Sequence, residues 1–209
     1  MDANKRIAIV GAGELGQQIA YCGKRNGYNI VAFFDDFMSE RVVLDIPVIG
    51  KVNDIDHLKS CFDSLVIGIG YLHLDIRKSL FEELSLKNDF ATIIDKTAYI
   101  DPSATIGKGS VIFPNVVLDK KVIVGDNVFV NISATIAHDS YIGNHSFLSP
   151  RVAIAGFTTI GQSSFLGINS TIIDNLNLPD NIRLGAGSVV VNCLEGEGLY
   201  CGVPAKKKK

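Results

Sequence analysis

The stretch from Val124 to Ile160, VGDNVFVNISATIAHDSYIGNHSFLSPRVAIAGFTTI, decides the fold of this chain because an aliphatic residue recurs in it at every sixth position. The same spacing continues in both directions without an insertion, through Ile100, Ile106, Ile112, Leu118, Val124, Val130, Ile136, Ile142, Leu148, Ile154, Ile160, Leu166, Ile172, Leu178, Leu184 and Val190. Two positions before each aliphatic the residue is nearly always small or β-branched, with Leu176 and Ile182 as exceptions. A period kept over this length predicts a solenoid of stacked repeats.

A second spacing is superimposed on the first. An aliphatic-glycine pair recurs at every third six-residue unit, as Ile106-Gly107, Val124-Gly125, Ile142-Gly143 and Ile160-Gly161, so three units make one coil. Each unit is expected to be a short strand and a turn, with its aliphatic side chain pointing inward and its backbone pairing with neighbouring coils. Residues 100–190 therefore predict a parallel β-helix of triangular cross-section with about five coils. The six-residue period alone does not determine whether this β-helix is left-handed or right-handed.

The first 95 residues follow a different pattern, in which short apolar runs alternate with amphipathic segments. Strands are predicted at 6–10, 29–34, 64–69 and 90–94, and helices at about 14–26 and 74–87. Alternating strands and helices are typical of a parallel α/β sheet. The sequence therefore predicts a small Rossmann-like domain over residues 1–95 and an all-β repeat domain over residues 96–209.

A glycine-rich loop, Gly11-x-Gly13-x-x-Gly16, connects the first predicted strand to the first helix, and Asp35 follows Gly16 by 19 residues. Glycines at this point allow a pyrophosphate to approach the unpaired N–H groups of a helix start, and an acid at this distance suits a ribose. Only about one mononucleotide half fits before the repeats begin. A nucleotide-linked sugar therefore fits better than NAD, and glycines that merely pack helix on strand are a third interpretation that stays open.

Composition excludes several classes of protein. The chain has 209 residues with 47% hydrophobic and 20% charged residues and a net charge of −2, which excludes a disordered chain and leaves no basic surface for nucleic acid. No apolar run approaches the ~20 residues of a membrane span. The apolar stretch near the start, Ile7 to Val10, is too short for a signal-peptide core, so a cytoplasmic location is expected. Four cysteines without a CxxC pair predict neither disulfides nor a zinc site.

Chemistry in the repeat region is expected at His138, because it lies off the inward aliphatic register and can face solvent. Adding 18 to its number reaches Gly156, so a glycine lies in the next coil, where a missing side chain leaves room for a slim ligand and frees a backbone N–H. An imidazole is suited to accept a proton near neutral pH.

The combination of the glycine loop, Phe34-Asp35-Asp36, Pro47-Val48-Ile49-Gly50, Gly68-Ile69-Gly70 and Arg77 with a six-residue repeat resembles the hexapeptide-repeat nucleotide-sugar 4-amino N-acetyltransferases. Proteins like the sialic acid O-acetyltransferases share this layout. The resemblance covers the whole chain and implies a left-handed β-helix and a homotrimer with active sites between subunits. It further implies that acetyl-CoA, without a metal, acetylates the 4-amino group of a nucleoside-diphosphate-linked 4-amino-4,6-dideoxy sugar.

The resemblance also implies roles for individual residues of the repeat region. His138 is expected to be the general base, Asp139 to raise its basicity, Asn131 to contact the amine, and the Gly156 N–H to face the acetyl carbonyl. Asp139 can act on His138 only if the two lie at a corner of the prism, because successive strand residues point in opposite directions. The coenzyme A contacts implied by the resemblance are Gly156, Phe147, Ile168, Ala186 and Lys206.

In the first domain the resemblance assigns the nucleotide sugar to Gly11, Gly13, Glu14, Asp35, Asp36, Gly68 and Gly70. Two positions depart from the family pattern. Gly70-Tyr71 stands where members often carry an asparagine, and Phe147 stands where many carry a second histidine, for which His145 is a candidate substitute. The terminal lysines, Lys206 to Lys209, are interpreted as a solubilising end or as a phosphate contact.

Three alternatives to N-acetylation stay open at this point. Acetylation of a hydroxyl group, as on sialic acid, would use the same base and donor. A zinc hydratase on the same prism needs three histidine ligands, and the repeat region has only His138 and His145. A prism without catalytic activity, serving as a scaffold, is the remaining alternative.

Overall fold

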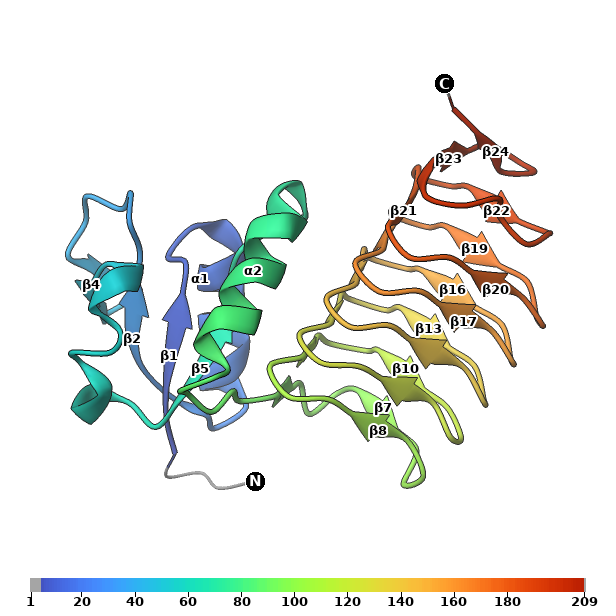
Figure 1. Cartoon of the computed structure of the whole chain (residues 1–209). Helices are drawn as coiled ribbons and strands as arrows, with labels where there is room; N and C mark the ends of the chain where they lie inside the picture. Colours follow the sequence, from blue (N-terminus) through green and yellow to red (C-terminus); the bar gives the residue numbers. More distant parts are fainter. Residues whose placement is uncertain (1–4, 209) are drawn as a thin grey trace. The chain divides into compact units, whose positions relative to one another are not determined.

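The computed structural model describes residues 5–208. The chain divides into two compact units, Met1–Ile94 and Asp95–Lys209, which are described separately below (Figure 1). In the described part of the chain, no helix combines the length and the hydropathy needed to cross a membrane.

The first unit is an α/β domain built on one small sheet with strand order β3-β4-β2-β1-β5, in which β1 pairs in parallel with both β2 and β5. Its elements are β1 (Arg6–Val10), α1 (Glu14–Arg25), β2 (Asn29–Phe34), β3 (Val42–Val43), β4 (Ile46–Gly50), η1 (Val52–Asp54), η2 (Lys59–Cys61), β5 (Ser64–Ile67), η3 (Tyr71–His73), α2 (Leu74–Leu84) and β6 (Ile93–Ile94). The central strands are apolar at every position after the first, as is typical of parallel strands buried on both faces of a sheet. The core contains Val10, Phe34, Leu65, Ile67 and Phe81.

Three details of this domain differ from the sequence-based prediction. The edge hairpin β3–β4 was not predicted, because β3 has only two residues and Pro47 interrupts the apolar pattern of β4. Of the predicted strand at 90–94, only a single bridge between Leu65 and Phe90 joins this sheet, and β6 belongs to a different, eight-stranded sheet. Helix α2 ends at Leu84, three residues earlier than predicted.

The second unit is a left-handed parallel β-helix with three flat faces. Face A consists of β7 (Tyr99–Ile100), β10 (Val117–Leu118), β13 (Thr135–Ile136), β16 (Ala153–Ile154), β19 (Thr171–Ile172) and β22 (Val189–Val190). Face B consists of β8 (Thr105–Ile106), β11 (Ile123–Val124), β14 (Tyr141–Ile142), β17 (Thr159–Ile160) and β20 (Asn177–Leu178). Face C contains β9 (Val111–Ile112), β12 (Phe129–Val130), β15 (Phe147–Leu148), β18 (Phe165–Leu166), β21 (Ile182–Leu184), β23 (Gly198–Cys201) and β24 (Lys206–Lys207).

The sixfold spacing of the aliphatics produces the core of this β-helix. Strands pair with the equivalent strand of the next coil, so that, for example, Ile136 lies opposite Leu118 and Ile154. From Ile112 to Val190 every aliphatic of the series is at most 3% exposed. Buried hydroxyls two positions earlier link successive coils: the Ser110 hydroxyl donates to the Gly125 carbonyl and accepts from the Val128 N–H. In the last two coils the equivalent hydroxyls of Ser170 and Ser188 are buried and have no hydrogen-bond partner among the described residues, so only the earlier coils are linked in this way.

The corners between faces are tight turns that contain a residue with positive φ, which is often asparagine, as at Asn115, Asn169 and Asn175. Each corner stacks on the equivalent corner of the next coil and forms an edge of the prism. Edge AB carries residues 137–140 and 155–158, edge BC carries residues 143–146, and edge CA carries residues 131–134, 167–170 and 185–188. The corners that share an edge therefore lie in columns along the prism axis (Figure 1).

Candidate functional site

His138 and Asp139 form a corner turn on edge AB, between β13 and β14. Asp139 has a φ of 56°, and this reversal of the chain brings its carboxylate back to the imidazole of the preceding residue. His138 Nδ1 lies 3.1 Å from Asp139 Oδ2. Because a carboxylate only accepts hydrogen bonds, Nδ1 of the neutral imidazole carries the proton and Nε2 keeps a free lone pair. The His138 side chain is 45% exposed, so part of the ring faces solvent.

The next coil encloses the imidazole from a second direction. A Cβ at Gly156 would lie 2.7 Å from His138 Cε1 and 3.0 Å from Nε2, so the ring packs directly against the glycine backbone. Phe157 adds an edge-on contact, with ring centroids 5.1 Å apart and planes at 84°. The imidazole is thus positioned by a carboxylate, a glycine surface and an aromatic ring, as a general base requires.

The backbone N–H of Gly156 has no hydrogen-bond partner in the described part of the chain, although the residue is buried. At two other corners the equivalent N–H donates to the preceding side chain: Lys120 N–H donates to Asp119 and Ile132 N–H to Asn131. Gly156 follows Ala155, whose methyl group cannot accept a hydrogen bond. An unpaired N–H beside an imidazole is a suitable donor for an oxyanion.

Asp139 also faces a cation from the coil on its other side. Lys121 Nζ lies 3.8 Å from Asp139 Oδ1, and their side chains are 61% and 30% exposed. Lys121 occupies the equivalent corner of the preceding coil, so both residues belong to the column of edge AB. The column of edge AB therefore places a cation beside the carboxylate that contacts His138.

Three other predicted residues, Asn131, Ile168 and Ala186, lie together on edge CA, separated from His138 by face A. The backbone N–H groups of Ile168 and Ala186 make no hydrogen bond with described residues. Asn131 Oδ1 accepts from the Ile132 N–H at 2.8 Å. Within one prism the predicted catalytic set is therefore divided between two edges, because the step from Asn131 to His138 is not a whole number of coils.

The remaining predicted residues of this unit lie elsewhere. His145 is buried on edge BC, with Nδ1 3.1 Å from the amide nitrogen of Asn127. Phe147 lies on face C and is buried in a stack of aromatic rings, with its ring centroid 4.8 Å from that of Phe129. Lys206 begins β24 and is exposed. Of the predicted terminal lysines, Lys209 lies outside the described residues.

The glycine loop of the first unit contains glycines of two kinds. A Cβ at Gly16 would lie 1.9 Å from the Gly11 carbonyl oxygen, and one at Gly68 would lie 2.6 Å from the Gly16 Cα, so these three glycines let backbones pack closely. Gly13 is different, because a Cβ there would meet nothing within 4 Å. Gly13 caps α1, and both it and Glu14 are exposed. Gly13 therefore leaves the start of the helix open to a ligand, as an anion site requires.

Asp35 and Asp36 follow β2 and both organise the surrounding backbone. Asp35 accepts hydrogen bonds from the N–H groups of Ala12, Phe37 and Met38. Burial alone raises the pKa of Asp35, but these three donors outweigh it and the net pKa is below its ordinary value. Asp36 accepts from the Val52 N–H at 3.0 Å and remains exposed. The two acids thus join the glycine loop to the loops after β2 and β4.

Two further residues named from the sequence lie near the end of β5. Gly70 precedes η3, and a Cβ there would meet nothing within 4 Å. Arg77 lies in α2 with its guanidinium fully buried, and burial lowers the pKa to about 9. Gly70 follows the carboxyl end of β5, and ligands of open α/β sheets bind at such strand ends.

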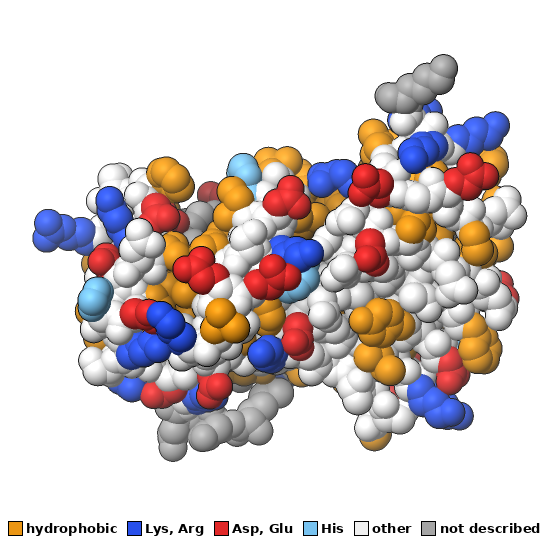
Figure 2. All heavy atoms as spheres, in the orientation of Figure 1, with side chains coloured by type: hydrophobic (Ala, Val, Ile, Leu, Met, Phe, Trp, Pro, Cys, Tyr) orange, Lys and Arg blue, Asp and Glu red, His pale blue; other side chains and the backbone are white. Residues whose placement is uncertain are grey.

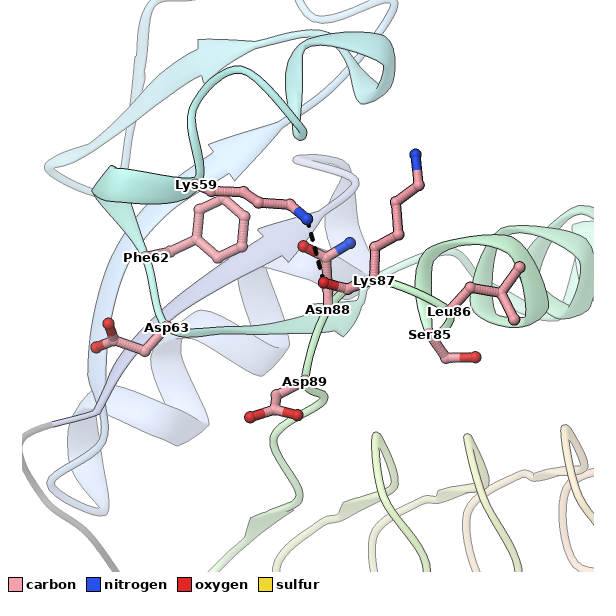
Figure 3. A pocket seen from close by; sticks show the side chains of 8 residues that line it. All are labelled: Lys59, Phe62, Asp63, Ser85, Leu86, Lys87, Asn88 and Asp89. Carbon is pink, nitrogen blue, oxygen red and sulfur yellow. Dashed lines mark hydrogen bonds between the residues drawn. The ribbon is translucent and has the colours of Figure 1, made fainter.

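A pocket occurs in the first unit at the opposite end of β5, lined by Lys59, Phe62, Asp63, Ser85, Leu86, Lys87, Asn88 and Asp89 (Figure 3). The lysines of this pocket interact with neighbouring groups of the protein. Lys59 Nζ donates to the Lys87 carbonyl, and Lys87 Nζ pairs with Asp56 at 2.8 Å. It lies at the amino ends of the strands, away from the glycine loop, and none of the predicted residues lines it.

Among the described residues no group of three or more His, Cys, Asp or Glu side chains is arranged to hold a metal ion. No disulfide joins any of the four cysteines. On the face drawn in Figure 2, acidic and basic side chains are interspersed.

Comparison with known proteins agrees with this division of the chain. Residues 6–84 match the family model of the PglD N-terminal domain, and residues 94–193 match that of the GMPPB C-terminal domain. Among solved structures, the acetyltransferase domain of PglB from Neisseria gonorrhoeae is 28% identical with a TM-score of 0.91, covering 98% of this chain and 100% of that one. The same domain has been solved in complex with acetyl coenzyme A.

PerB from Caulobacter crescentus, solved with CoA and GDP-perosamine, is 26% identical with a TM-score of 0.91, covering 99% of this chain and 98% of that one. WeeI from Acinetobacter baumannii is 21% identical with a TM-score of 0.83, covering 97% of this chain and 99% of that one, and at this identity the likeness concerns the fold.

Proposed function

Since this chain belongs to the hexapeptide-repeat nucleotide-sugar N-acetyltransferases, we propose that it transfers acetyl from acetyl-CoA to the 4-amino group of a nucleoside-diphosphate-linked 4-amino-4,6-dideoxy sugar. The observation that carries this proposal is the corner of edge AB. There the imidazole of His138, oriented by Asp139, lies against Gly156, whose N–H has no partner among the described residues. The repeat unit, residues 96–209, binds acetyl-CoA, and residues 1–95 bind the nucleotide sugar.

The chemistry follows from these groups. The sugar amine attacks the thioester carbonyl, a C–N bond forms, and the carbonyl oxygen becomes an oxyanion that the Gly156 N–H stabilises. His138 Nε2 accepts the proton that the nitrogen must lose, and Asp139 stabilises the resulting imidazolium. The C–S bond then breaks, and His138 returns the proton to the departing thiolate of coenzyme A. None of these steps requires a metal.

The nucleotide sugar is held by the loops after β1, β2 and β5. The pyrophosphate meets the open start of α1 at Gly13 and Glu14, beside Gly11. Asp35 and Asp36 hold the nucleoside, and Gly68 and Gly70 leave room beside it. For Asp35 this role rests on the ionised carboxylate, which keeps accepting capacity beyond its three backbone donors.

We place the donor and the second half of the site on edge CA of a neighbouring subunit in a homotrimer. Asn131, Ile168 and Ala186 share that edge, and the N–H groups of Ile168 and Ala186, which have no partner among the described residues, suit the amides of a pantetheine arm. Phe147 and Lys206 complete the expected coenzyme A contacts. Exposed apolar side chains on both edges of face A, among them Ile132 and Ile173, support burial against another subunit. Because the reaction consumes acetyl-CoA, we expect it in the cytoplasm.

The first test is kinetic. His138→Ala should lower kcat by about 10²-fold or more without changing the melting temperature. The exposed His57→Ala serves as the matched control and should keep wild-type activity. Near-wild-type turnover of His138→Ala would exclude this residue as the base. A matched pair of 4-amino and 4-hydroxy nucleotide sugars separates N-acetylation from O-acetylation.

The trimer is tested by mixing inactive subunits. If each site combines edge AB of one subunit with edge CA of the next, a mixed trimer of His138→Ala and Asn131→Ala subunits contains one site with both residues intact. Random reassembly of equal amounts should then restore about one quarter of wild-type activity. No recovery in trimers shown to be mixed, or a monomer in light scattering, would refute the shared site.

A further inference from the structure

Phe157 is an unusual residue for its position. The prism corners with positive φ are otherwise occupied, in the described chain, by Gly109, Asn115, Lys121, Asn127, Ser133, Asp139, His145, Arg151, Ser163, Asn169, Asn175, Asn181 and Gly187. Phe157 is the single member of this set with an apolar side chain, with a φ of 54°, and the residue is 56% exposed. A bulky side chain in this backbone conformation is disfavoured, and exposure of the ring adds a second unfavourable term. Neither is explained by packing within the core.

The location of Phe157 suggests what compensates for this arrangement. It is next to Gly156, and its ring contacts the imidazole of His138 edge-on at 5.1 Å. One part of the ring therefore limits the movement of the imidazole, and the exposed remainder forms an apolar wall directly beside it. We propose that this wall is a specificity-determining surface that binds the methyl group of the sugar next to the reacting amine.

The geometry of the acceptor leads to the methyl group in particular. This step rests on the proposed function, which brings the amine on C4 of the sugar within hydrogen-bond reach of His138 Nε2. The two carbons next to C4 then lie beside the imidazole as well. In a 4-amino-4,6-dideoxyhexose one of them, C3, carries a hydroxyl and the other, C5, carries a methyl. An apolar ring matches the methyl, and a 6-hydroxyl in its place would lose hydration against the ring.

The experiment compares two acceptors that have the same nucleotide and differ only at C6, one with a methyl and one with a hydroxymethyl group. Wild-type kcat/KM should favour the methyl sugar about 10-fold or more. Phe157→Asn should bring the ratio to within about 3-fold of unity. Phe157→Leu, which keeps an apolar surface, should retain the preference. Ile123→Asn, which removes an exposed apolar side chain from face B, should leave the ratio at its wild-type value.

Two further readouts separate this role from a structural one. Asparagine favours positive φ, so Phe157→Asn should not lower the melting temperature, and its molar mass in light scattering should equal that of the wild type. The ratio of rates with acetyl-CoA and propionyl-CoA should also be unchanged, because the wall faces the acceptor.

Several results would overturn the inference. These are an unchanged sugar ratio, an equal loss of activity with both sugars, a change in donor preference instead, or dissociation of the assembly, which would make Phe157 a subunit contact. A wild-type protein inactive with every 4-amino nucleotide sugar would refute the proposed function itself, and the inference with it. An active wild type with an unaltered ratio in Phe157→Asn refutes only the inference.

Discussion

Replacing Gly156 by alanine should separate catalysis from stability. The added Cβ would lie 2.7 Å from Cε1, 3.0 Å from Nε2 and 3.2 Å from Nδ1 of His138, and contacts below 3.0 Å force one partner to move. The partner here is the end of an exposed side chain, which can rotate away at little cost. The imidazole then loses its 3.1 Å contact with Asp139 and its place beside the Gly156 N–H.

We expect Gly156→Ala to lower kcat by about 10²-fold, comparable with removal of a positioned base, while unfolding free energy changes by less than about 1 kcal/mol. Release of the coenzyme A thiol, followed with a chromogenic disulfide, measures the rate, and urea denaturation measures stability. Gly143→Ala is the matched control in the preceding coil, because its Cβ would lie 2.4 Å from the backbone nitrogen of Gln162. That backbone cannot rotate away, so the control should lose stability.

The opposite result has a clear meaning. Full activity in Gly156→Ala, with the imidazole displaced in its crystal structure, would show that the position of His138 against the glycine is irrelevant. A large loss of stability would show that the corner, rather than the side chain, cannot adjust.

Two other predictions concern the first unit. Gly13→Ala should keep the melting temperature and raise the KM for the nucleotide sugar about 10-fold. Gly16→Ala should instead destabilise the domain by about 2–4 kcal/mol, because its Cβ would lie 1.9 Å from the Gly11 carbonyl oxygen. Equal effects of both substitutions on stability would contradict a binding role for Gly13. Because the pKa of Asp35 is lowered in the folded state, its contribution is present above the ordinary carboxyl pKa of about 4 and is lost as the pH falls below it. Asp35→Asn should therefore lose about 1–3 kcal/mol in urea denaturation at pH 7 and much less at pH 3, and equal losses at both would refute this account.

The fold of the repeat unit could be predicted because its information is local and repeated. The same six-residue spacing repeats in every coil, so Ile136 and Ile154 could be assigned to the core from that spacing alone. The edge strands β3 and β4 could not, because two-residue strands have no periodicity and Pro47 disrupts the pattern. Handedness came from the resemblance, since a period of six residues is compatible with either hand.

The site could be predicted in part. The spacing of one coil correctly brings Gly156 to His138, and the corner geometry brings Asp139 to the same ring. Asn131 was expected near them, yet its spacing from His138 already indicated a different edge. Phe157 was missed, although an aromatic residue at a corner position that elsewhere holds glycine or a polar residue was a visible signal.

The pairing of His138 with Gly156 has a consequence for how such a chain can change in length. Loss or gain of one hexad between them would rotate every later residue onto the next face and move the glycine a third of a turn away from the imidazole. Only the insertion or deletion of a whole coil between the two residues keeps all later residues on their faces. Even such a change moves His138 and Gly156 apart along the axis of the β-helix. A change in length outside residues 138–156 leaves the pair in contact, but only whole coils keep Ile168 and Ala186 on edge CA. Lineages that lengthen or shorten should therefore do so in whole coils near the ends of the β-helix.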